Sequence, residues 1–257
     1  MAYIYGKNPI FEAIQSNKPI QKIYVLHRNQ SGKVRQIYRL AREKRIAIVN
    51  ADAHKMKKMV GDVNHQGIIA LVSPVRIGGL DDLLGTISQM IESAEKTKDQ
   101  RKSRPISLAI ADKIQDPHNM GAIIRSAEVF GLKGVIYSGR ENVPITEVVV
   151  KASAGAALHC PLYRADNLAQ AVDRLKEIGF WIYGASLEGD ASLWQVDFDR
   201  HCAIIIGSEE KGIRPLLQKK CDQLYKIPQL GKTQSLNASV AAGVSFAEIV
   251  RQQSAKK

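Results

Sequence analysis

The hydrophobic positions of the chain repeatedly change their spacing, from the alternation of a strand to the three-to-four-residue spacing of an amphipathic helix. In the first 76 residues this pattern predicts a small α/β unit. A short helix is expected to begin at Asn8 and Pro9. After it, strands are expected at 21–27, 46–50 and 68–73, and helices at 33–45 and 52–60. Asp52 stands in the right place to cap the helix that follows it.

The next segment, 77–105, has a weaker pattern. A helix is expected at 80–91, whereas 94–105 is charged, has no apolar periodicity and is interpreted as a solvated linker. The pattern then restarts, so the sequence predicts a unit at 1–76, a linker at 77–105 and a second unit at 106–257.

Strands and helices alternate through the second unit, which predicts a mostly parallel sheet covered by helices on both faces. The expected strands are 107–111, 134–137, 180–184, 203–206 and 223–227, and the expected helices are 120–130, 167–178, 213–220 and 236–252. Ligands of such sheets bind beyond the carboxyl ends of the strands. Three loops are therefore candidates for a site, namely those after Ala111, Ile206 and Ile227.

The loop after Ala111 leads into a helix with polar candidates. Asn119 is expected to cap this helix, and Arg125 follows on an otherwise apolar stretch. A buried arginine without a partner is costly, so Arg125 is expected to face an anion or a carboxylate, with an interface salt bridge as the structural alternative. His118 is a candidate general base, although a lone loop histidine more often has a structural role.

The loop after Ile206 begins at Gly207, where the apolar strand breaks and a ligand or another backbone can approach closely. Glu209 is expected to stand just outside the sheet. The loop lacks the GxGxxG spacing of a dinucleotide-binding turn. The alternative interpretation is a surface turn with solvated glutamates.

The segment 227–242 is a polar loop that enters a helix of small residues. Ser235 and Asn237 stand at the start of that helix, and simple N-capping by Asn237 is the structural alternative to a ligand contact. The Gly-Lys-Thr sequence at 231–233 is not a P-loop, because Lys226 occupies the position of the motif's first glycine.

Positive charge is concentrated in the first unit. Residues 1–76 contain 14 Lys or Arg and 4 Asp or Glu, a net charge of +10, whereas residues 77–257 contain 23 and 21, a net charge of +2. A basic unit joined to a nearly neutral one is typical of a polyanion-binding module. Nucleic acid is therefore the expected partner, with solubility alone as the alternative.

The lengths of the apolar runs and the spacing of the cysteines bear on the cellular compartment of the chain. No run approaches the roughly 18 apolar residues of a membrane span, and the N-terminus lacks the apolar core of a signal peptide, so the chain is expected to be cytoplasmic. Cys160, Cys202 and Cys221 lack paired spacing and are interpreted as reduced thiols rather than metal ligands or disulfides.

Taken together, three segments resemble the sequence motifs of the SpoU (TrmH-like) branch of the SPOUT RNA methyltransferases. They are 116–127, 207–213 and 227–242, in the family's order and approximate spacing. The segment 151–156 also fits the family, and the basic first unit resembles the L30e/L7Ae-like substrate-binding domain of RlmB-like members. Two departures are Glu210, where the family commonly has Gly, and Ala238, where it commonly has Val.

The resemblance implies an α/β trefoil-knot methyltransferase domain preceded by a small α/β RNA-binding domain. It also implies a homodimer that uses S-adenosylmethionine and no metal. The implied catalytic residues are Asn119, Arg125, Glu209, Ser235 and Asn237. The implied cofactor contacts, through backbone groups and adenine packing, are Gly184, Gly207, Ile227 and Leu236.

The reaction implied by the resemblance is methyl transfer to a ribose 2′-hydroxyl, most closely that of a guanosine in 23S ribosomal RNA. Because arginine is a poor base, Arg125 is expected to bind the adjacent RNA phosphate and polarise the hydroxyl, with Asn119 and Glu209 fixing its orientation. A tRNA is the alternative substrate. Alternatives of other classes are a non-catalytic ribosome-assembly factor, which the intact polar set opposes, and a nucleotide-dependent oxidoreductase, which the missing GxGxxG opposes.

Overall fold

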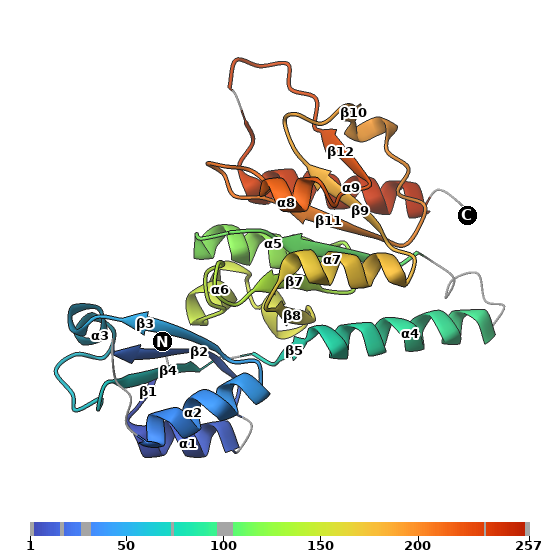
Figure 1. Ribbon diagram of the computed structural model, residues 1–257. Helices are drawn as coiled ribbons and strands as arrows, with labels where there is room; N and C mark the ends of the chain where they lie inside the picture. The colour runs from blue at the N-terminus through green and yellow to red at the C-terminus, as the bar shows by residue number, and fades with distance from the viewer. Residues whose placement is uncertain are drawn as a thin grey trace.

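Two β-sheets organise the chain in the computed structural model, which describes residues 3–15, 18–26, 32–72, 75–96, 105–233 and 235–254. Within these residues the first sheet has four strands in the order β1-β4-β2-β3, and the second has eight in the order β10-β12-β9-β11-β6-β7-β8-β5. Figure 1 shows the smaller sheet at the end of the larger one where β8 and β5 lie.

The smaller unit is formed by β1 (Tyr3–Tyr5), α1 (Lys7–Gln15), β2 (Ile20–Leu26), α2 (Gly32–Glu43), β3 (Ala47–Ala51), α3 (Ala53–Val60) and β4 (Ile68–Val72). Ile23 of β2 packs with residues of α1 and α2 on one face of the sheet, whereas Tyr24 packs with Met56 of α3 on the other. Asp52 caps α3 as predicted, because its carboxylate accepts a hydrogen bond from the backbone N–H of Lys55 at 2.7 Å.

The larger unit begins at Ile77, a few residues after β4 ends. Its first elements are β5 (Ile77–Gly79), α4 (Leu80–Lys96), β6 (Ser107–Ala111), α5 (Pro117–Val129), β7 (Val135–Ser138), α6 (Glu147–Ala152), η1 (Ala156–Leu158) and β8 (Leu162–Ala165). Its later elements are α7 (Leu168–Glu177), β9 (Trp181–Ala185), β10 (Ala191–Ser192), η2 (Leu193–Gln195), β11 (Cys202–Ile206), α8 (Pro215–Gln218), β12 (Gln223–Lys226) and α9 (Ala238–Ser254). The pairs between neighbouring strands of this described sheet are parallel.

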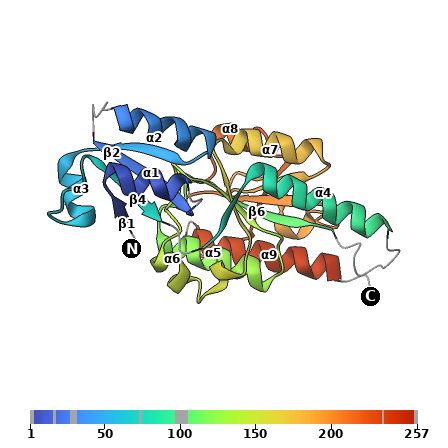
Figure 2. The same cartoon turned by 90° about the horizontal axis from the view of Figure 1, so that it is seen from below.

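Helices cover both faces of the larger sheet (Figure 2). Successive residues of a strand point to opposite faces, so Leu108 of β6 packs in the cluster that includes α4 and α7, whereas Ala109 packs in the cluster that includes α5 and α9. The central strands β6 and β11 are buried along their whole length, which is why they are apolar at nearly every position. The predicted α/β class and parallel sheet are confirmed.

Part of the segment predicted as a linker packs with the larger sheet. β5 pairs with β8 through Ile77 and Leu162, and α4 buries Leu83 and Ile87 in the core. β5 could not be predicted from the pattern of apolar positions, because it has three residues and two of them are glycines, which leaves no alternation to detect. Residues 97–104 of the predicted linker lie outside the described residues, and the division at positions 76 and 105 stays a prediction.

Polar groups connect the smaller unit to the larger one, and we call this set of contacts the joint. The Gln21 side chain accepts a hydrogen bond from the backbone N–H of Ile145 at 2.6 Å and donates one to the carbonyl oxygen of the same residue. The guanidinium of Arg164, on β8, donates to the carbonyl oxygens of Gln21 and Arg45 at 2.9 and 2.5 Å. Arg45 also forms an ion pair with Asp81 of α4 at 2.7 Å.

Two further predictions from the sequence concern the cysteines and the possibility of a membrane span. Cys160, Cys202 and Cys221 are free thiols, and burial raises the pKa of each to about 12, which keeps them protonated at neutral pH. In the part of the chain that the structure describes, no helix is long and apolar enough to cross a bilayer.

Candidate active site

The three candidate loops meet at one edge of the larger sheet. β6 and β11 end together, since Ala111 pairs with Ile206. The loop after β11 and the segment after β12 line a cleft of about 410 Å³, together with the turn that follows β9. A smaller hollow of about 310 Å³ is lined by the loop after β6 and shares residues 208–211 with the cleft. The predicted convergence of these loops at the carboxyl ends of the strands is therefore confirmed.

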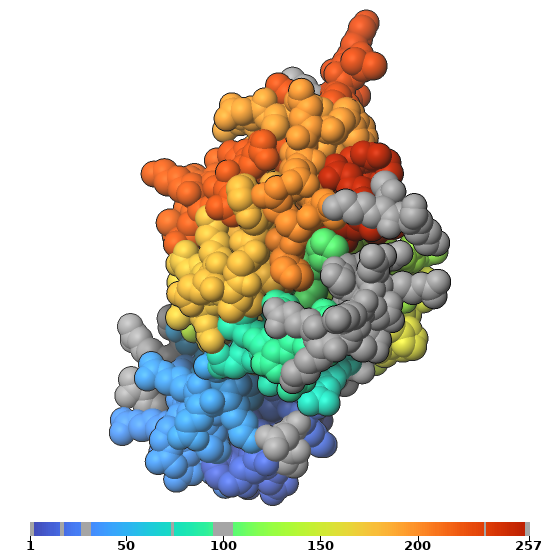
Figure 3. Space-filling view, turned by 90° about the vertical axis from the view of Figure 1, so that its right-hand side faces the viewer, coloured from blue at the N-terminus to red at the C-terminus, as the bar shows by residue number. Residues whose placement is uncertain are grey.

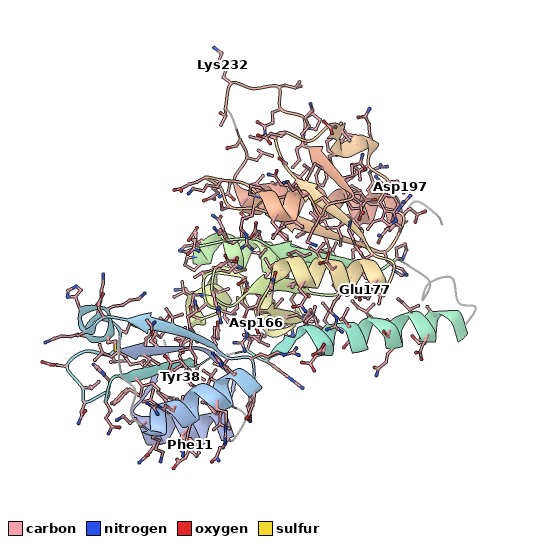
Figure 4. The ribbon with its side chains drawn as sticks, viewed as in Figure 1. Phe11, Tyr38, Asp166, Glu177, Asp197 and Lys232 are labelled. Atoms are coloured by element: carbon pink, nitrogen blue, oxygen red, sulfur yellow. The ribbon has the colours of Figure 1, made fainter. Side chains whose placement is uncertain are left out.

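The segment after β12 also projects away from the sheet. Lys232 stands at the tip of this loop, with its side chain directed away from the body of the protein (Figure 4). In the space-filling view the loop forms a narrow protrusion (Figure 3). Leu230 in the same loop is fully exposed. An exposed arm therefore stands beside the cleft.

A cluster of polar side chains joins the three loops. The carboxylate oxygen Oε1 of Glu209 accepts hydrogen bonds from the side-chain amides of Asn119 and Asn237, each at 2.5 Å. The Asn237 amide also donates to Oδ1 of Asn119 at 3.0 Å. We call Asn119, Glu209 and Asn237 the polar triad. The fold brings together one predicted site residue from each loop.

Asn237 has two roles, because the two ends of its amide face different partners. Its Oδ1 accepts hydrogen bonds from the backbone N–H groups of Ser239 and Val240 at 2.9 and 3.4 Å, which caps the start of α9. Its Nδ2 belongs to the polar triad. Helix capping, which the sequence left as an alternative, is therefore compatible with a place in the site.

Asn119 does not cap α5, which corrects the expectation from sequence. The N-cap is Asp116, whose carboxylate accepts a hydrogen bond from the backbone N–H of His118 at 3.1 Å, and Pro117 takes the first helical position. Proline has no N–H to satisfy and a fixed φ, so the helix begins there rather than three residues later. Asn119 is thus buried inside the first turn, with its amide directed to Glu209, while His118 is exposed.

Arg125 lies on the same helix but away from the polar triad. Six residues of α-helix rotate a side chain by about 240° relative to Asn119. The Arg125 side chain is exposed, and within the described residues no partner of its guanidinium is recorded. The expected contact of Arg125 with Asn119 and Glu209 is therefore not made within one chain.

The two glycines predicted as cofactor contacts have different roles. Gly207 lines the cleft, and a Cβ there would lie 2.1 Å from the carbonyl carbon of Gly212, so this turn closes only around a glycine. Gly184 does not line the cleft, because its Cα faces Leu224, where a Cβ would come within 2.6 Å of a side-chain methyl group. Ser186, two residues later, is in the cleft wall instead.

The other predicted contacts lie in the cleft wall. Ile227, Ser235 and Leu236 line it, and they combine apolar surface with one hydroxyl group. Tyr225 also lines the cleft and donates its hydroxyl to Ser245 at 2.7 Å. Burial raises the pKa of Tyr225, which keeps the phenol protonated and able to make this hydrogen bond.

A buried ion-pair network behind the site was not expected from sequence. Asp112 is fully buried, and its two carboxylate oxygens accept hydrogen bonds from the side-chain Nε and the backbone N–H of Arg214, at 2.7 and 2.9 Å. The Arg214 guanidinium also pairs with Glu141 at 2.6 Å. The network ties the loop after β6 to the loop that carries Glu209. The sequence feature that could have predicted this network is an aspartate directly after an apolar strand, because a carboxylate buried there needs a partner.

Known proteins share this architecture. Residues 107–247 match the SpoU rRNA Methylase family, and residues 3–77 match a domain described as RNA 2′-O ribose methyltransferase substrate binding. YacO of Bacillus subtilis (strain 168), assigned to the TrmH family of tRNA/rRNA methyltransferases, is 35% identical over 251 residues, which cover 98% of this chain and 96% of YacO.

Solved structures of the SpoU methyltransferase AviRb from Streptomyces viridochromogenes have the same fold. One crystal structure covers 99% of this chain and 90% of its own, with a TM-score of 0.59 and 22% sequence identity. A second, in complex with the cofactor AdoMet, covers 99% and 91%, with a TM-score of 0.56 and 22% identity.

The chain belongs to the SpoU rRNA methylase family, because the family match extends over more than half of it. It is an RNA methyltransferase of the kind that uses S-adenosylmethionine. The family, the class of activity and the cofactor that the sequence motifs implied are confirmed.

Proposed function

We propose that the chain transfers a methyl group from S-adenosylmethionine to the 2′-hydroxyl of a guanosine in 23S ribosomal RNA. The observation that carries the proposal is the polar triad, which stands beside a cleft at the carboxyl ends of the strands of a SpoU-family chain. The match of residues 3–77 to the substrate-binding domain of RNA 2′-O ribose methyltransferases supports a ribose hydroxyl as the acceptor. The net charge of +10 in residues 1–76 supports an RNA substrate, and the choice of a ribosomal target rests on the resemblance of the two-unit layout to RlmB-like members.

The cleft fits the cofactor in size and in chemistry. Its volume of about 410 Å³ lies within the range of small-molecule sites. Ile227 and Leu236 offer apolar contacts to an adenine ring, Gly207 allows close backbone approach, and Ser235 offers a hydroxyl group. When bound, the cofactor supplies an electrophilic methyl group on its sulfonium. The wall residues would bind the cofactor and position that group for the acceptor, and such positioning lowers a reaction barrier by several kcal/mol.

The polar triad is assigned to the acceptor side of the reaction. Glu209 lines both the cleft and the smaller hollow, whereas Asn119 lines the smaller hollow. A ribose held in the smaller hollow would therefore present its hydroxyl beside the triad and toward the cleft. Because Asn119 and Asn237 fix one oxygen of Glu209, the carboxylate has a defined orientation toward that hydroxyl.

A homodimer completes the proposed site. Arg125 has no recorded partner in the described part of its own chain, and Val129 and Val240, on α5 and α9, are 66% and 48% exposed. Gly243 of α9 lies close to Ser126 of α5, so these two helices form one continuous surface. Pairing two such surfaces would bury the valines and bring Arg125 of the partner subunit to the polar triad. There its planar guanidinium binds an RNA phosphate and polarises the 2′-hydroxyl.

The trefoil knot that the resemblance implies belongs to the same proposal. In the strand order β12-β9-β11-β6-β7-β8, the chain runs outward through β7 and β8 and then returns across the sheet to β9, on the other side of β11. Small residues, among them Ala238 and Ala242, allow α9 to pass close to α5. These features support a threaded C-terminal segment.

Mapping of ribose methylation tests the proposed substrate. A strain without the gene is expected to lose one 2′-O-methylguanosine from 23S ribosomal RNA, and the intact gene is expected to restore it. A copy encoding Glu209→Ala should restore the methylation less completely than the intact gene. Loss of a tRNA methylation instead would replace the ribosomal target by tRNA, and an unchanged methylation map in both RNAs would reject the proposal.

Mixing of inactive variants tests the shared site. Arg125→Ala and Glu209→Ala are each expected to react about 100-fold more slowly than the wild type, so neither contributes to the fast phase of a single turnover. A dimer with one subunit of each has one site with both changes and one site with neither. Random pairing should therefore restore about a quarter of the wild-type single-turnover amplitude. The matched control is a mixture of Asn119→Ala with Glu209→Ala, in which every site is damaged. No recovery in the first mixture would show that Arg125 acts within its own subunit or not at all.

A further inference from the structure

A lysine is buried at the joint between the two sheets. β2 shifts its register against β4 between Ile20 and Lys22, which marks a β-bulge at Gln21. Gln21 makes its hydrogen bonds to Ile145 in the larger unit. Lys22 continues the strand on the face that carries Tyr24, two residues later, and only 7% of Lys22 is exposed.

The surroundings of Lys22 are cationic. The charged groups that act on it are Lys55 of α3 and Arg164 of β8, and after burial itself both lower the pKa of its ammonium group. Within the described ranges no oxygen is recorded as a hydrogen-bond or ion-pair partner of the Lys22 Nζ. Lys55 places its own Nζ 5.7 Å from the ring centroid of Tyr24, on the same face of the sheet. Among the described residues, three cations therefore gather where no carboxylate acts on Lys22.

Such an arrangement needs an anion. An ammonium group withdrawn from water without a partner is unfavourable, and two further cations increase the cost. A buried lysine stem can still direct its head toward the surface, where a ligand reaches it. The anion expected here is a phosphate, because the unit that contains Lys22 has a net charge of +10 and matches a substrate-binding domain for RNA.

We propose that Lys22, with Lys55 and Arg164, is a phosphate-binding point at the joint that holds one backbone phosphate of the RNA between the two units. Arg164 contributes charge rather than a new hydrogen bond, since its guanidinium already donates to carbonyl oxygens of the smaller unit. The RNA as the source of the phosphate rests on the proposed function. The need for an anionic ligand follows from the buried cation cluster itself.

Thermal unfolding with inorganic phosphate tests the ligand. Lys22→Met removes the charge and keeps an unbranched side chain one atom shorter. Lys133→Met is the matched control, because Lys133 is exposed just before β7, at the end of the larger sheet opposite to the cleft. Phosphate is expected to raise the Tm of the wild type and of Lys133→Met, and to leave the Tm of Lys22→Met unchanged. An equal rise in all three proteins would overturn the site.

RNA binding tests the source of the phosphate. Loss of one phosphate contact should lower the affinity of Lys22→Met for ribosomal RNA about tenfold at 0.1 M salt and reduce the slope of log K against log salt by about 0.7 to 0.9. A wild-type slope in Lys22→Met would overturn the proposal. If Lys22→Met fails to fold, Lys55→Met, which changes an exposed side chain, is measured in the same way and should show the same loss of slope. A wild-type protein that responds to phosphate but binds no ribosomal RNA would instead reject the proposed substrate.

Discussion

Glu209→Ala is expected to lower the single-turnover rate of methyl transfer about 100-fold, which is the usual effect of losing the alignment of a reacting group. The substitution removes the one oxygen to which the amides of Asn119 and Asn237 both donate, so the polar triad loses its centre. Cofactor affinity should change little, because most of the cleft wall is untouched.

Glu210→Ala is the matched control for this measurement. Glu210 is the next residue, is equally exposed, and has no recorded partner in the described part of the chain. Its rate should stay within about threefold of the wild type, as expected for a side chain that aligns nothing. Calorimetry with S-adenosylhomocysteine separates a binding defect from a chemical one. A Glu209→Ala enzyme with a wild-type rate at saturating cofactor would remove the triad from the mechanism.

Asp112→Ala is expected to destabilise the protein by about 3 kcal/mol, at the lower end of the cost of breaking a buried ion pair. The lower end applies because Arg214 keeps Glu141 as a partner and is itself 29% exposed. Urea denaturation gives the free energy of unfolding.

The control for this second prediction is a surface ion pair. Asp173→Ala breaks the pair of Asp173 with Lys220, whose side chains are 49% and 28% exposed, and should cost less than about 1 kcal/mol. Adding Arg214→Met to Asp112→Ala should recover part of the loss, because no unpaired guanidinium remains. Equal effects of Asp112→Ala and Asp173→Ala would show that the buried network contributes no more than a surface pair.

Local signals in the sequence predicted most of the large elements. Asp52 was correctly placed as the cap of α3, because capping involves residues only three positions apart. The same rule chose wrongly at α5, where Asp116 and Asn119 are both good caps and Pro117 decides between them. β5 and β8 were not expected, since strands of three and four residues depend on neighbours that only the folded sheet supplies.

Several residues of the candidate site could be predicted from the sequence, whereas the contacts between them could not. The motifs named Asn119, Glu209 and Asn237, but spacing alone cannot show that side chains 90 and 118 positions apart share hydrogen bonds. The resemblance implied that Gly184 contacts the cofactor, yet Gly184 does not line the cleft and packs against Leu224. The Asp112 to Arg214 pair spans 102 positions and follows no local pattern.

Apart from the Arg45 to Asp81 ion pair, the contacts described for the joint between the two sheets are made to peptide groups rather than to side chains. Gln21 and Arg164 bind the backbone N–H and C=O groups of Ile145, Gln21 and Arg45. Every residue except proline presents the same backbone groups. Substitutions at Arg45 or Ile145 that do not change the backbone conformation therefore leave these hydrogen bonds in place. The spacing between the smaller and the larger sheet therefore depends little on which side chains stand at these two positions.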